Sequence, residues 1–262
     1  MTKNNMKKLL LLLFIFSLST FSFSQSVDKK GLEIASKSIE MDQGFNSLST
    51  KLKMTLKNKN GQTSERLLEN KILEQTEDGD LSLILFNTPK DVKGTATLTY
   101  THKVGPDDQW LFLPAINRVK RISSSNKSGP FMGSEFSFED LASAELEKYT
   151  YKFIGEENGL LIVETYPVDP KSGYSKRRVF YNARMRYRVE KVEFYDRKGT
   201  HQKTLTYEGF KIYKDKFWRA DVFLMKNHQT NKETKLEFSD WNFDANFTKN
   251  DFTQEALKKA GK

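Results

Sequence analysis

The sequence contains no cysteine among its 262 residues, and this absence limits both how it is stabilised and how it meets a membrane. No disulfide can form, so folding must depend on strand pairing and on the burial of apolar side chains. Lipid attachment through a cysteine is excluded for the same reason. Long apolar runs are also missing after residue 16, whereas a bilayer-spanning helix needs about 20 apolar residues. The sequence therefore predicts neither an acylated cysteine nor a later membrane span.

Residue patterns typical of catalysis and metal binding are missing as well. The three histidines, His102, His201 and His228, lie far from one another and from any second metal ligand in the sequence. Neither the Gly-x-Ser-x-Gly nucleophile motif nor the glycine-rich phosphate-binding loop occurs. We therefore expect no catalytic residue, no metal site, no cofactor and no enzymatic activity. A lipid hydrolase dependent on these histidines is the least favoured class of function.

The first 24 residues have the layout of a secretory signal peptide. Three lysines precede an unbroken apolar run, Leu9–Phe16, and small residues that include Ser22 and Ser24 follow it. We expect cleavage near Ser24 and export to the periplasm, with residues 25–262 forming a single domain. The alternative is an uncleaved membrane anchor, which the shortness of the apolar run disfavours.

The charge of the chain is basic, with a formal value of +9 that falls to +6 once the three lysines of the leader are removed. Export argues against nucleic acid as the partner of this basic surface. Anionic lipid head groups, lipopolysaccharide or an acidic protein face are the expected contacts.

Most of the chain shows the period of two that is typical of half-buried strands. Leu52 and Met54 alternate with lysines, and Asn158-Gly159 is typical of a tight hairpin turn. The pattern predicts roughly eleven strands at hairpin spacing. Helices are expected over residues 28–44 and 251–259. The predicted fold is mainly β, with one antiparallel sheet strongly curved or partly closed into a barrel.

Basic residues recur on the predicted strand faces. Arg184, Arg186 and Arg188 are predicted to share one face, and in the preceding strand Arg177 points to the same side as Val179. One interpretation is a solvated outer surface of the sheet. The other is a contact surface for an anionic membrane or a partner protein.

Residues 109–141 depart from this regular pattern. The stretch begins as a strand that is apolar on both faces, which indicates burial on both sides. It then becomes basic, and ends in glycines and serines interleaved with phenylalanine. The residues of interest are Trp110, Leu111, Phe112 and Leu113 in the strand, Arg118, Lys120 and Arg121 in the basic part, and Phe131, Met132, Phe136 and Phe138 in the last part.

Five motifs in and before this stretch are similar to those of a known family. They are Lys93–Ala96, Thr99–His102, Gln109–Ala115, Arg118–Ser123 and Phe131–Leu141. Together they resemble the outer-membrane lipoprotein-sorting family, the larger LolA-like group within the superfamily of periplasmic lipoprotein carriers. The resemblance implies an incomplete, strongly curved antiparallel barrel with helices across its open side. It also implies that lipid or acylated lipoprotein cargo is held between membranes.

This resemblance gives the residues of the stretch possible roles. An acyl chain of about 14 methylenes costs roughly 11 kcal/mol to expose to water, so a carrier must offer a comparable apolar surface. Plain packing in the core is the alternative for each aromatic, and surface solvation is the alternative for each basic residue. The expected wall or lid of a lipid-binding cavity consists of Trp110, Phe112, Leu113, Phe131, Met132, Phe136 and Phe138. The expected contacts to a head group at the cavity margin are Arg118, Lys120 and Arg121.

Two classes of function remain open on the sequence. One is a non-catalytic periplasmic carrier of lipid or lipoprotein acyl chains. The other is an interaction module whose interior is filled by its own side chains. Such a module would dock on an envelope transporter or membrane receptor through Arg184, Arg186 and Arg188. An apolar cavity of several hundred Å³ beneath residues 109–141 would favour the carrier.

Overall fold

The computed structural model describes residues 20–262, with their side chains from residue 29 onward. Most of the expected signal peptide, residues 1–24, lies outside the described residues, as does the side chain of Ser24 at the expected cleavage point. None of the helices in the described part is both long and apolar enough to cross a bilayer.

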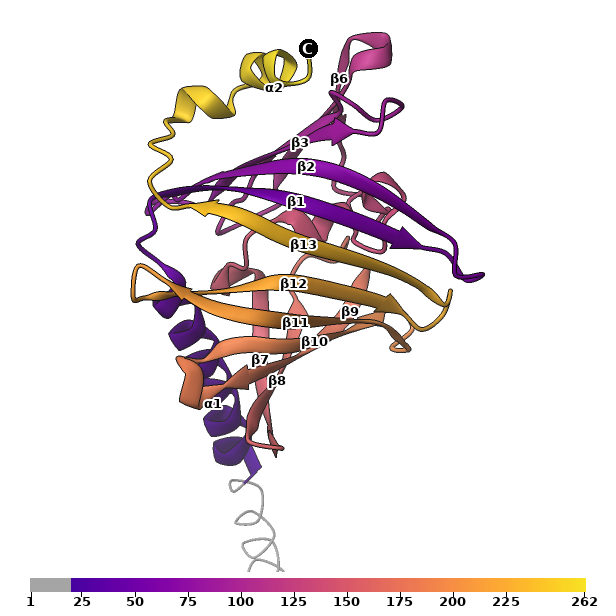
Figure 1. The fold of residues 1–262 in the computed structure, drawn as a ribbon. Coiled ribbons are helices and arrows are strands. Elements are labelled where there is room, and N and C mark those ends of the chain that lie inside the picture. Colours follow the sequence, from indigo (N-terminus) through magenta and orange to yellow (C-terminus); the bar gives the residue numbers. More distant parts are fainter. Residues whose placement is uncertain (1–19) are drawn as a thin grey trace, which may run out of the picture.

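Thirteen strands form a single antiparallel sheet in the order β6-β5-β4-β3-β2-β1-β13-β12-β11-β10-β9-β8-β7 (Figure 1). Two meanders, β1 to β6 and β7 to β13, are joined where β1 pairs with β13. The strands are β1 (Ser47–Lys57), β2 (Thr63–Leu73), β3 (Leu81–Thr88), β4 (Ala96–Tyr100), β5 (Asp108–Leu113), β6 (Arg118–Ile122), β7 (Tyr149–Glu157), β8 (Leu160–Pro167), β9 (Tyr174–Asn182), β10 (Arg188–Asp196), β11 (His201–Tyr213), β12 (Phe217–Asn227) and β13 (Lys232–Asn242).

The sheet is strongly curved but does not close, because β6 and β7 stand at its two ends without pairing to each other. This confirms the predicted class, a mainly β protein with an incomplete antiparallel barrel. The number of strands is thirteen rather than roughly eleven. The short basic strand β6 is one that the sequence pattern did not predict.

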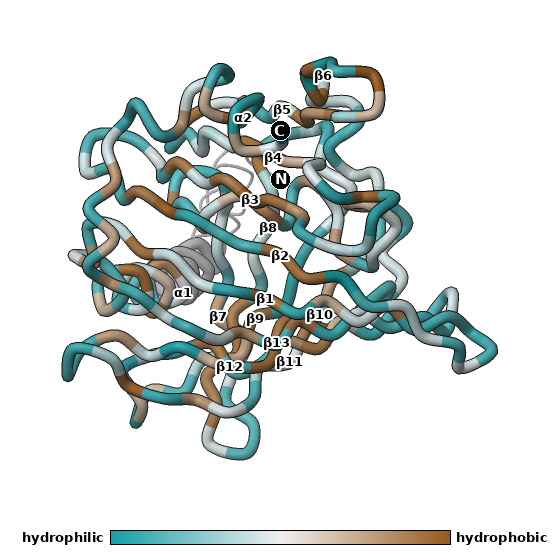
Figure 2. The backbone as a smooth tube through the Cα atoms, turned by 45° about the horizontal axis from the view of Figure 1, so that its top comes forward, coloured by the Kyte–Doolittle hydropathy of each residue, from teal (hydrophilic) through white to brown (hydrophobic). Residues whose placement is uncertain are grey.

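Local sequence explains the strands and their turns. Hydrophobic and hydrophilic residues alternate along them, as Figure 2 shows by colour. In β1, Leu52 and Met54 are buried, while Lys51 and Lys53 point outward to ion pairs with acids of β13. The predicted turn between β7 and β8 is confirmed, since Asn158 and Gly159 both have positive φ, at 51° and 78°.

The N-terminal helix α1 (Thr20–Asp42) packs against β7 and β8. It begins before the predicted start at residue 28. A Cβ at Gly31 would lie only 2.9 Å from the backbone nitrogen of Phe153, so glycine allows the helix to approach β7 closely. The apolar side chain of Leu32 lies on the outer face of the helix, where it is 45% exposed. The buried face of the helix consists of Gly31, Ile34 and Ala35.

The C-terminal helix α2 (Gln254–Ala260) begins within the predicted helical segment, 251–259, and covers the convex face of β3 to β5 (Figure 1). Phe252 and Leu257 pack there against Phe112 of β5. A Cβ at Gly261 would lie 2.4 Å from the ring of Phe112, so only glycine fits without movement. The helix explains why β5 is apolar on both faces: one faces α2 and the other faces the main core.

The segment between β6 and β7, residues 123–148, connects the two opposite ends of the sheet. It must therefore cross the width of the sheet, and it does so on the concave side (Figure 1). It contains three short 3-10 turns, Phe131–Gly133, Phe138–Leu141 and Leu146–Lys148. We call it the inner segment, because its aromatic residues belong to the main hydrophobic cluster.

Candidate functional site

The concave face of β8 to β12 presents three rows of side chains, set by the antiparallel register. The first row crosses the strands as Thr165, Arg177, Phe194, Lys203 and Asn227. The second row is apolar and consists of Val163, Val179, Val192, Leu205 and Met225. The third row contains Tyr181, Val189, Tyr207 and Phe223. The face therefore changes from cationic to aliphatic to aromatic along the strands.

Two adjoining cavities lie over this concave face. The larger has a volume of about 660 Å³ and extends over all three rows. The smaller, of about 540 Å³, lies over β1, β2, β12 and β13. They share lining residues from α1, among them Ser38 and Ile39, and Phe136 from the inner segment. Both volumes are typical of small-molecule sites, which usually measure about 300–1,000 Å³.

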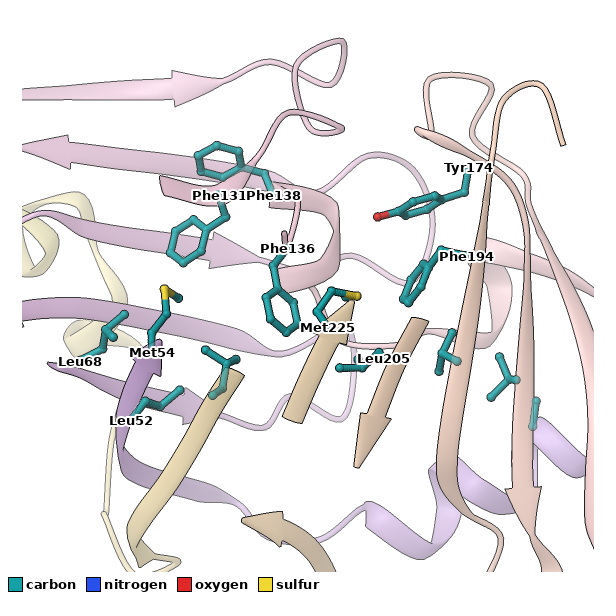
Figure 3. Packing of buried hydrophobic residues seen from close by; sticks show 14 of the residues in the cluster. Leu52, Met54, Leu68, Phe131, Phe136, Phe138, Tyr174, Phe194, Leu205 and Met225 are labelled. Carbon is teal, nitrogen blue, oxygen red and sulfur yellow. The ribbon is translucent and has the colours of Figure 1, made fainter. Parts of the chain in front are cut away.

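Aromatic side chains of the inner segment form part of the walls. Phe131 and Phe136 line the smaller cavity, and Phe136 also lines the larger one. Figure 3 shows them pointing from the inner segment toward Met54 and Met225. The ring of Phe131 lies 5.7 Å from that of Phe86, so it packs into the core on one side and borders a cavity on the other.

A buried ion pair fixes the inner segment to the sheet. Lys203 Nζ lies 2.8 Å from Asp140 Oδ2, and the two side chains are only 5% and 6% exposed. Asp140 also accepts hydrogen bonds from Ser137 N at 2.7 Å and Tyr174 Oη at 2.9 Å. Burial raises the pKa of Asp140, but the charge of Lys203 and these hydrogen bonds outweigh burial and hold it below its usual value.

Further hydrogen bonds tie the inner segment to strands on both halves of the sheet. Gln109 of β5 donates to the carbonyl of Phe138 at 2.8 Å. Asn227 of β12 donates to the carboxylate of Glu135 at 2.6 Å, and the backbone nitrogen of Glu135 donates to Thr234 Oγ1 at 2.9 Å. These hydrogen bonds hold the inner segment inside the curved sheet, away from its rim.

The solved structures most similar to this chain identify its family. A crystal structure described as an outer membrane lipoprotein-sorting protein domain from Vibrio parahaemolyticus is 49% identical, with a TM-score of 0.86. The match covers 88% of this chain and 99% of that one. The chain belongs to the outer-membrane lipoprotein-sorting family. The resemblance of the five motifs between Lys93 and Leu141 is thereby confirmed.

Other comparisons show which further proteins this lipoprotein-sorting chain is similar to. A family model described only as an uncharacterized protein matches residues 78–259. A protein of the DUF1329 family from Desulfovibrio piger is 24% identical, with a TM-score of 0.82 over 88% of this chain and 99% of that one. A LolA superfamily protein from Nitrosomonas europaea is 19% identical, with a TM-score of 0.70 over 86% and 98%. The last two show a shared fold. No curated protein matches the chain.

The strand predicted as a cavity wall lies differently from the prediction. Trp110 and Phe112 face the convex side beneath α2, and neither lines a cavity. Leu111 and Leu113 face the main cluster instead, but they do not line either cavity. The sequence showed that both faces of β5 are buried. It did not show which face α2 would cover.

The predicted lid residues divide into two groups. Phe131 and Phe136 do line the cavities, whereas Met132 and Phe138 pack in or against the main cluster without lining them. The carbonyl of Met132 accepts a hydrogen bond from Arg66 of β2. The structure therefore brings two of these four residues to the cavities and uses the other two to hold the inner segment in place.

The predicted basic margin lies at an edge of the sheet and does not border a cavity. Arg118, Lys120 and Arg121 are exposed on the end strand β6, and none of them lines a cavity. Arg121 is paired with Asp108 of β5. This arrangement therefore does not place the three residues where they were predicted to contact a head group, at the cavity mouth.

The predicted common face of Arg184, Arg186 and Arg188 is wrong. Residues 183–185 form a 3-10 turn, and Arg186 and Tyr187 both have φ of 55°, so the chain is not extended there. Arg188 begins β10 and stacks over the ring of Phe210 at 3.8 Å. Arg186 and Arg188 instead line the smaller cavity, while Arg184 is exposed on the turn.

The site also contains residues that the sequence does not place at a cavity. Lys203 and Asp140 form its buried ion pair, and Tyr181, Tyr207 and Arg177 line its larger cavity. A signal was available for Arg177, because it shares a strand face with Val179 and so had to point toward the core. That pattern was interpreted as an outer basic surface.

Two acids beside the cavities give the site a pH dependence. Burial raises the pKa of Asp80 to about 6. Burial, together with the negative charge of Asp80, raises that of Glu145 to about 7. Because the folded state binds these protons more tightly than the unfolded chain, the two acids weaken folding progressively between their ordinary pKa values of 3.8 and 4.5 and these raised values. Stability is recovered as the pH falls from about 7 toward 4.

The Glu145→Gln variant is therefore expected to be more stable than the wild type at about pH 8, by about 1–2 kcal/mol after allowance for partial solvation. The gain should shrink toward pH 5 and vanish near about pH 4, where the carboxyl is protonated in both the folded and the unfolded state. Urea unfolding across this range measures both. Glu157→Gln, at the exposed end of β7, is the control and should change stability at neither pH. An equal gain at both pH values would contradict the role of ionisation.

Proposed function

We propose that the chain is an exported, non-catalytic carrier that holds lipid or lipoprotein acyl chains in its concave interior as they pass between membranes. The observation that carries this proposal is the pair of adjoining cavities, about 660 and 540 Å³, inside a lipoprotein-sorting fold. The related domain from Vibrio parahaemolyticus is described by the same sorting role. Family membership also supports a periplasmic location.

The chemistry of the cavity walls supports acyl chains as the occupants. Most lining residues from the strands are aliphatic or aromatic, for example Leu52, Met54 and Phe238 in the smaller cavity and Val192 and Leu205 in the larger. Transferring an acyl chain of about 14 methylenes from water to such walls lowers its free energy by roughly 11 kcal/mol. Because the sheet does not close between β6 and β7, its concave side leaves a route for entry and release beside α1 and the inner segment.

Direct detection of bound lipid tests the proposal. The exported protein, purified from its own periplasm without detergent, is extracted with organic solvent and the extract is analysed by mass spectrometry. A co-purifying acyl lipid is expected, and so is saturable uptake of a fluorescent fatty acid by the delipidated protein. Absence of both would exclude the carrier function.

Ser38 offers a specific way to close the cavities. It lies on α1 at their shared wall, and its side chain is small. A Ser38→Trp substitution should place an indole in the shared space and reduce the affinity for an acyl probe about 10-fold or more, equivalent to about 1.4 kcal/mol. Overpacking is expected to cost up to about 1–3 kcal/mol of stability.

Ser36 supplies the matched control for this experiment. It lies two residues earlier on the same helix, contacts Glu40 on the exposed side, and lines neither cavity. Ser36→Trp should bind the probe like the wild type. If the two variants lose affinity equally, the acyl chain does not occupy the shared space.

A further inference from the structure

The larger cavity contains a guanidinium group that has no acidic partner. Arg177 projects from β9 onto the concave face and lines this cavity. Its Nε donates a long hydrogen bond of 3.4 Å to Thr165 Oγ1, and its guanidinium lies 4.0 Å from the ring centre of Tyr149. Among residues 29–262, no carboxylate lies within the 4.0 Å that defines an ion pair with it. A charge in such a place normally has a partner.

The neighbouring cation in the same row shows the contrast. Lys203 is separated from Arg177 only by Phe194 of the intervening strand. Its ammonium is neutralised by Asp140 at 2.8 Å and also donates to the carbonyl of Glu135 at 2.9 Å. The chain therefore supplies a directly paired acid for Lys203, whereas the negative charge of Asp140 acts on Arg177 only from beyond ion-pairing distance.

The acids on the walls of the larger cavity are mostly engaged elsewhere. Asp169 is 2.6 Å from Lys127, and Asp107 is paired with Lys148. Glu139 accepts hydrogen bonds from Ser172 Oγ and Gly173 N, both at 2.9 Å. The full set of acids lining this cavity is Asp107, Glu139, Asp140, Glu145, Glu147 and Asp169. Asp140 is held by Lys203, and none of the six is paired with Arg177.

Phenol groups line the cavity on the other side of the aliphatic row from Arg177. Burial raises the pKa of Tyr181 to about 12 and raises that of Tyr207 further, so both stay protonated at neutral pH. Arg177 lines the same cavity as the two phenols, and its positive charge lowers the pKa of both against the larger effect of burial. Between the guanidinium and these phenols lies the aliphatic row that includes Val179 and Leu205. The cavity therefore joins a cation and hydroxyl donors to an apolar floor.

We propose that Arg177 binds the anionic head of an amphiphile whose acyl chain lies on the apolar floor of the larger cavity. The head is a carboxylate or a phosphate, because a guanidinium fork fits the paired oxygens of either group. This inference rests on the proposed carrier function and narrows its cargo. The acyl esters of a lipoprotein are neutral, so the larger cavity selects a free anionic lipid.

The test compares ligands that differ only in the head group. Binding of dodecanoate, dodecyl phosphate and dodecanol to the delipidated full protein is measured by calorimetry at about pH 8, where carboxylic acids are ionised. The wild type is expected to bind at least one of the anions about 10-fold or more tightly than the alcohol, which is the scale of a charge-assisted hydrogen bond. Tighter binding of the phosphate indicates a phospholipid head, and tighter binding of dodecanoate indicates a fatty acid.

Variants then assign the preference to one residue. Arg177→Met should abolish the difference in affinity between anion and alcohol, and Arg177→Lys should retain part of that difference. Arg178→Met is the matched control, because Arg178 is the next residue and points to the convex face toward Glu164. It should keep the full preference. Thermal unfolding confirms that each variant is folded.

The outcomes separate this inference from the carrier function. Equal binding of the three ligands to the wild type would overturn the anion site and leave the carrier intact. A preference that persists in Arg177→Met would likewise overturn the assignment to Arg177. No binding of any ligand, including the alcohol, would instead reject the carrier function on which the inference rests.

Discussion

The Lys203→Met variant is expected to lose about 3–5 kcal/mol of unfolding free energy, because it leaves a buried carboxylate without its counter-charge. Asp140 would keep the hydrogen bonds from Ser137 and Tyr174 but would lose the ammonium 2.8 Å away. The carbonyl of Glu135 would lose its donor as well. Domains of this kind have total stabilities of only about 5–15 kcal/mol, so the loss is a large fraction.

Urea unfolding of the variant measures this loss, and two further variants define its origin. Lys226→Met removes an exposed lysine that lies 3.8 Å from Glu233 and should cost less than about 0.5 kcal/mol. Adding Asp140→Asn to Lys203→Met should restore part of the stability, since a neutral amide needs no counter-charge. A double variant less stable than Lys203→Met alone would show that the carboxylate is not the source of the penalty.

The pH dependence of the same variant has a definite sign. In the wild type the pKa of Asp140 lies below its usual value, so its contribution to stability is present above that range and is lost as the pH falls. Without Lys203, burial alone would raise this pKa above that of the unfolded chain. The stability difference between variant and wild type should therefore shrink as the pH falls from about 7 to 5.

Much of the fold follows from local sequence. The alternation around Leu52 and Met54 and the Asn158-Gly159 turn specify strands and a hairpin by short-range sterics and burial. The pairing of β1 with β13 is not specified in this way, because it joins segments about 180 residues apart. An alternating pattern says that a strand has an inner face but does not say which distant strand lies beside it.

The basic face at Arg184 to Arg188 shows how an alternating pattern can mislead. The residues read as a strand, yet Arg186 and Tyr187 adopt the left-handed conformation that usually calls for glycine or asparagine. Neither residue gives a turn signal, so the turn could not be predicted. By contrast, the alternation along β9 correctly predicts that Arg177 and Val179 share one face. Because Val179 is apolar, the same pattern indicates that this face points toward the core.

The inner segment was the least predictable part. Its glycines and serines are typical of surface loops, and its phenylalanines suggested a cover over cargo. Its position depends on topology, because β6 and β7 stand at opposite ends of the sheet and their connection has to cross the interior. The buried pair of Asp140 with Lys203 could not be inferred either, since it joins residues 63 positions apart.

Phe131→Ala distinguishes a structural inner segment from a movable lid. The side chain is 1% exposed and packs between Phe86 and Phe138, with ring centres 5.7 and 5.6 Å away. Removing a ring from such a site is expected to cost about 3–5 kcal/mol, through lost transfer energy and the void that remains. Leu67→Ala is the control, because Leu67 is 48% exposed on β2 and should change stability by less than about 0.5 kcal/mol.

The two roles of Phe131 predict opposite patterns of stability and binding. In a fixed wall, the substitution lowers stability and enlarges the smaller cavity, so an acyl probe still binds. In a lid that opens at little cost, the substitution weakens binding of the probe or accelerates its release. The free energy of unfolding then stays nearly unchanged. Urea unfolding and probe dissociation on the same preparation separate these cases. The anchoring of Glu135, Phe138 and Asp140 to five strands favours the fixed wall, and entry of cargo would then take place beside α1.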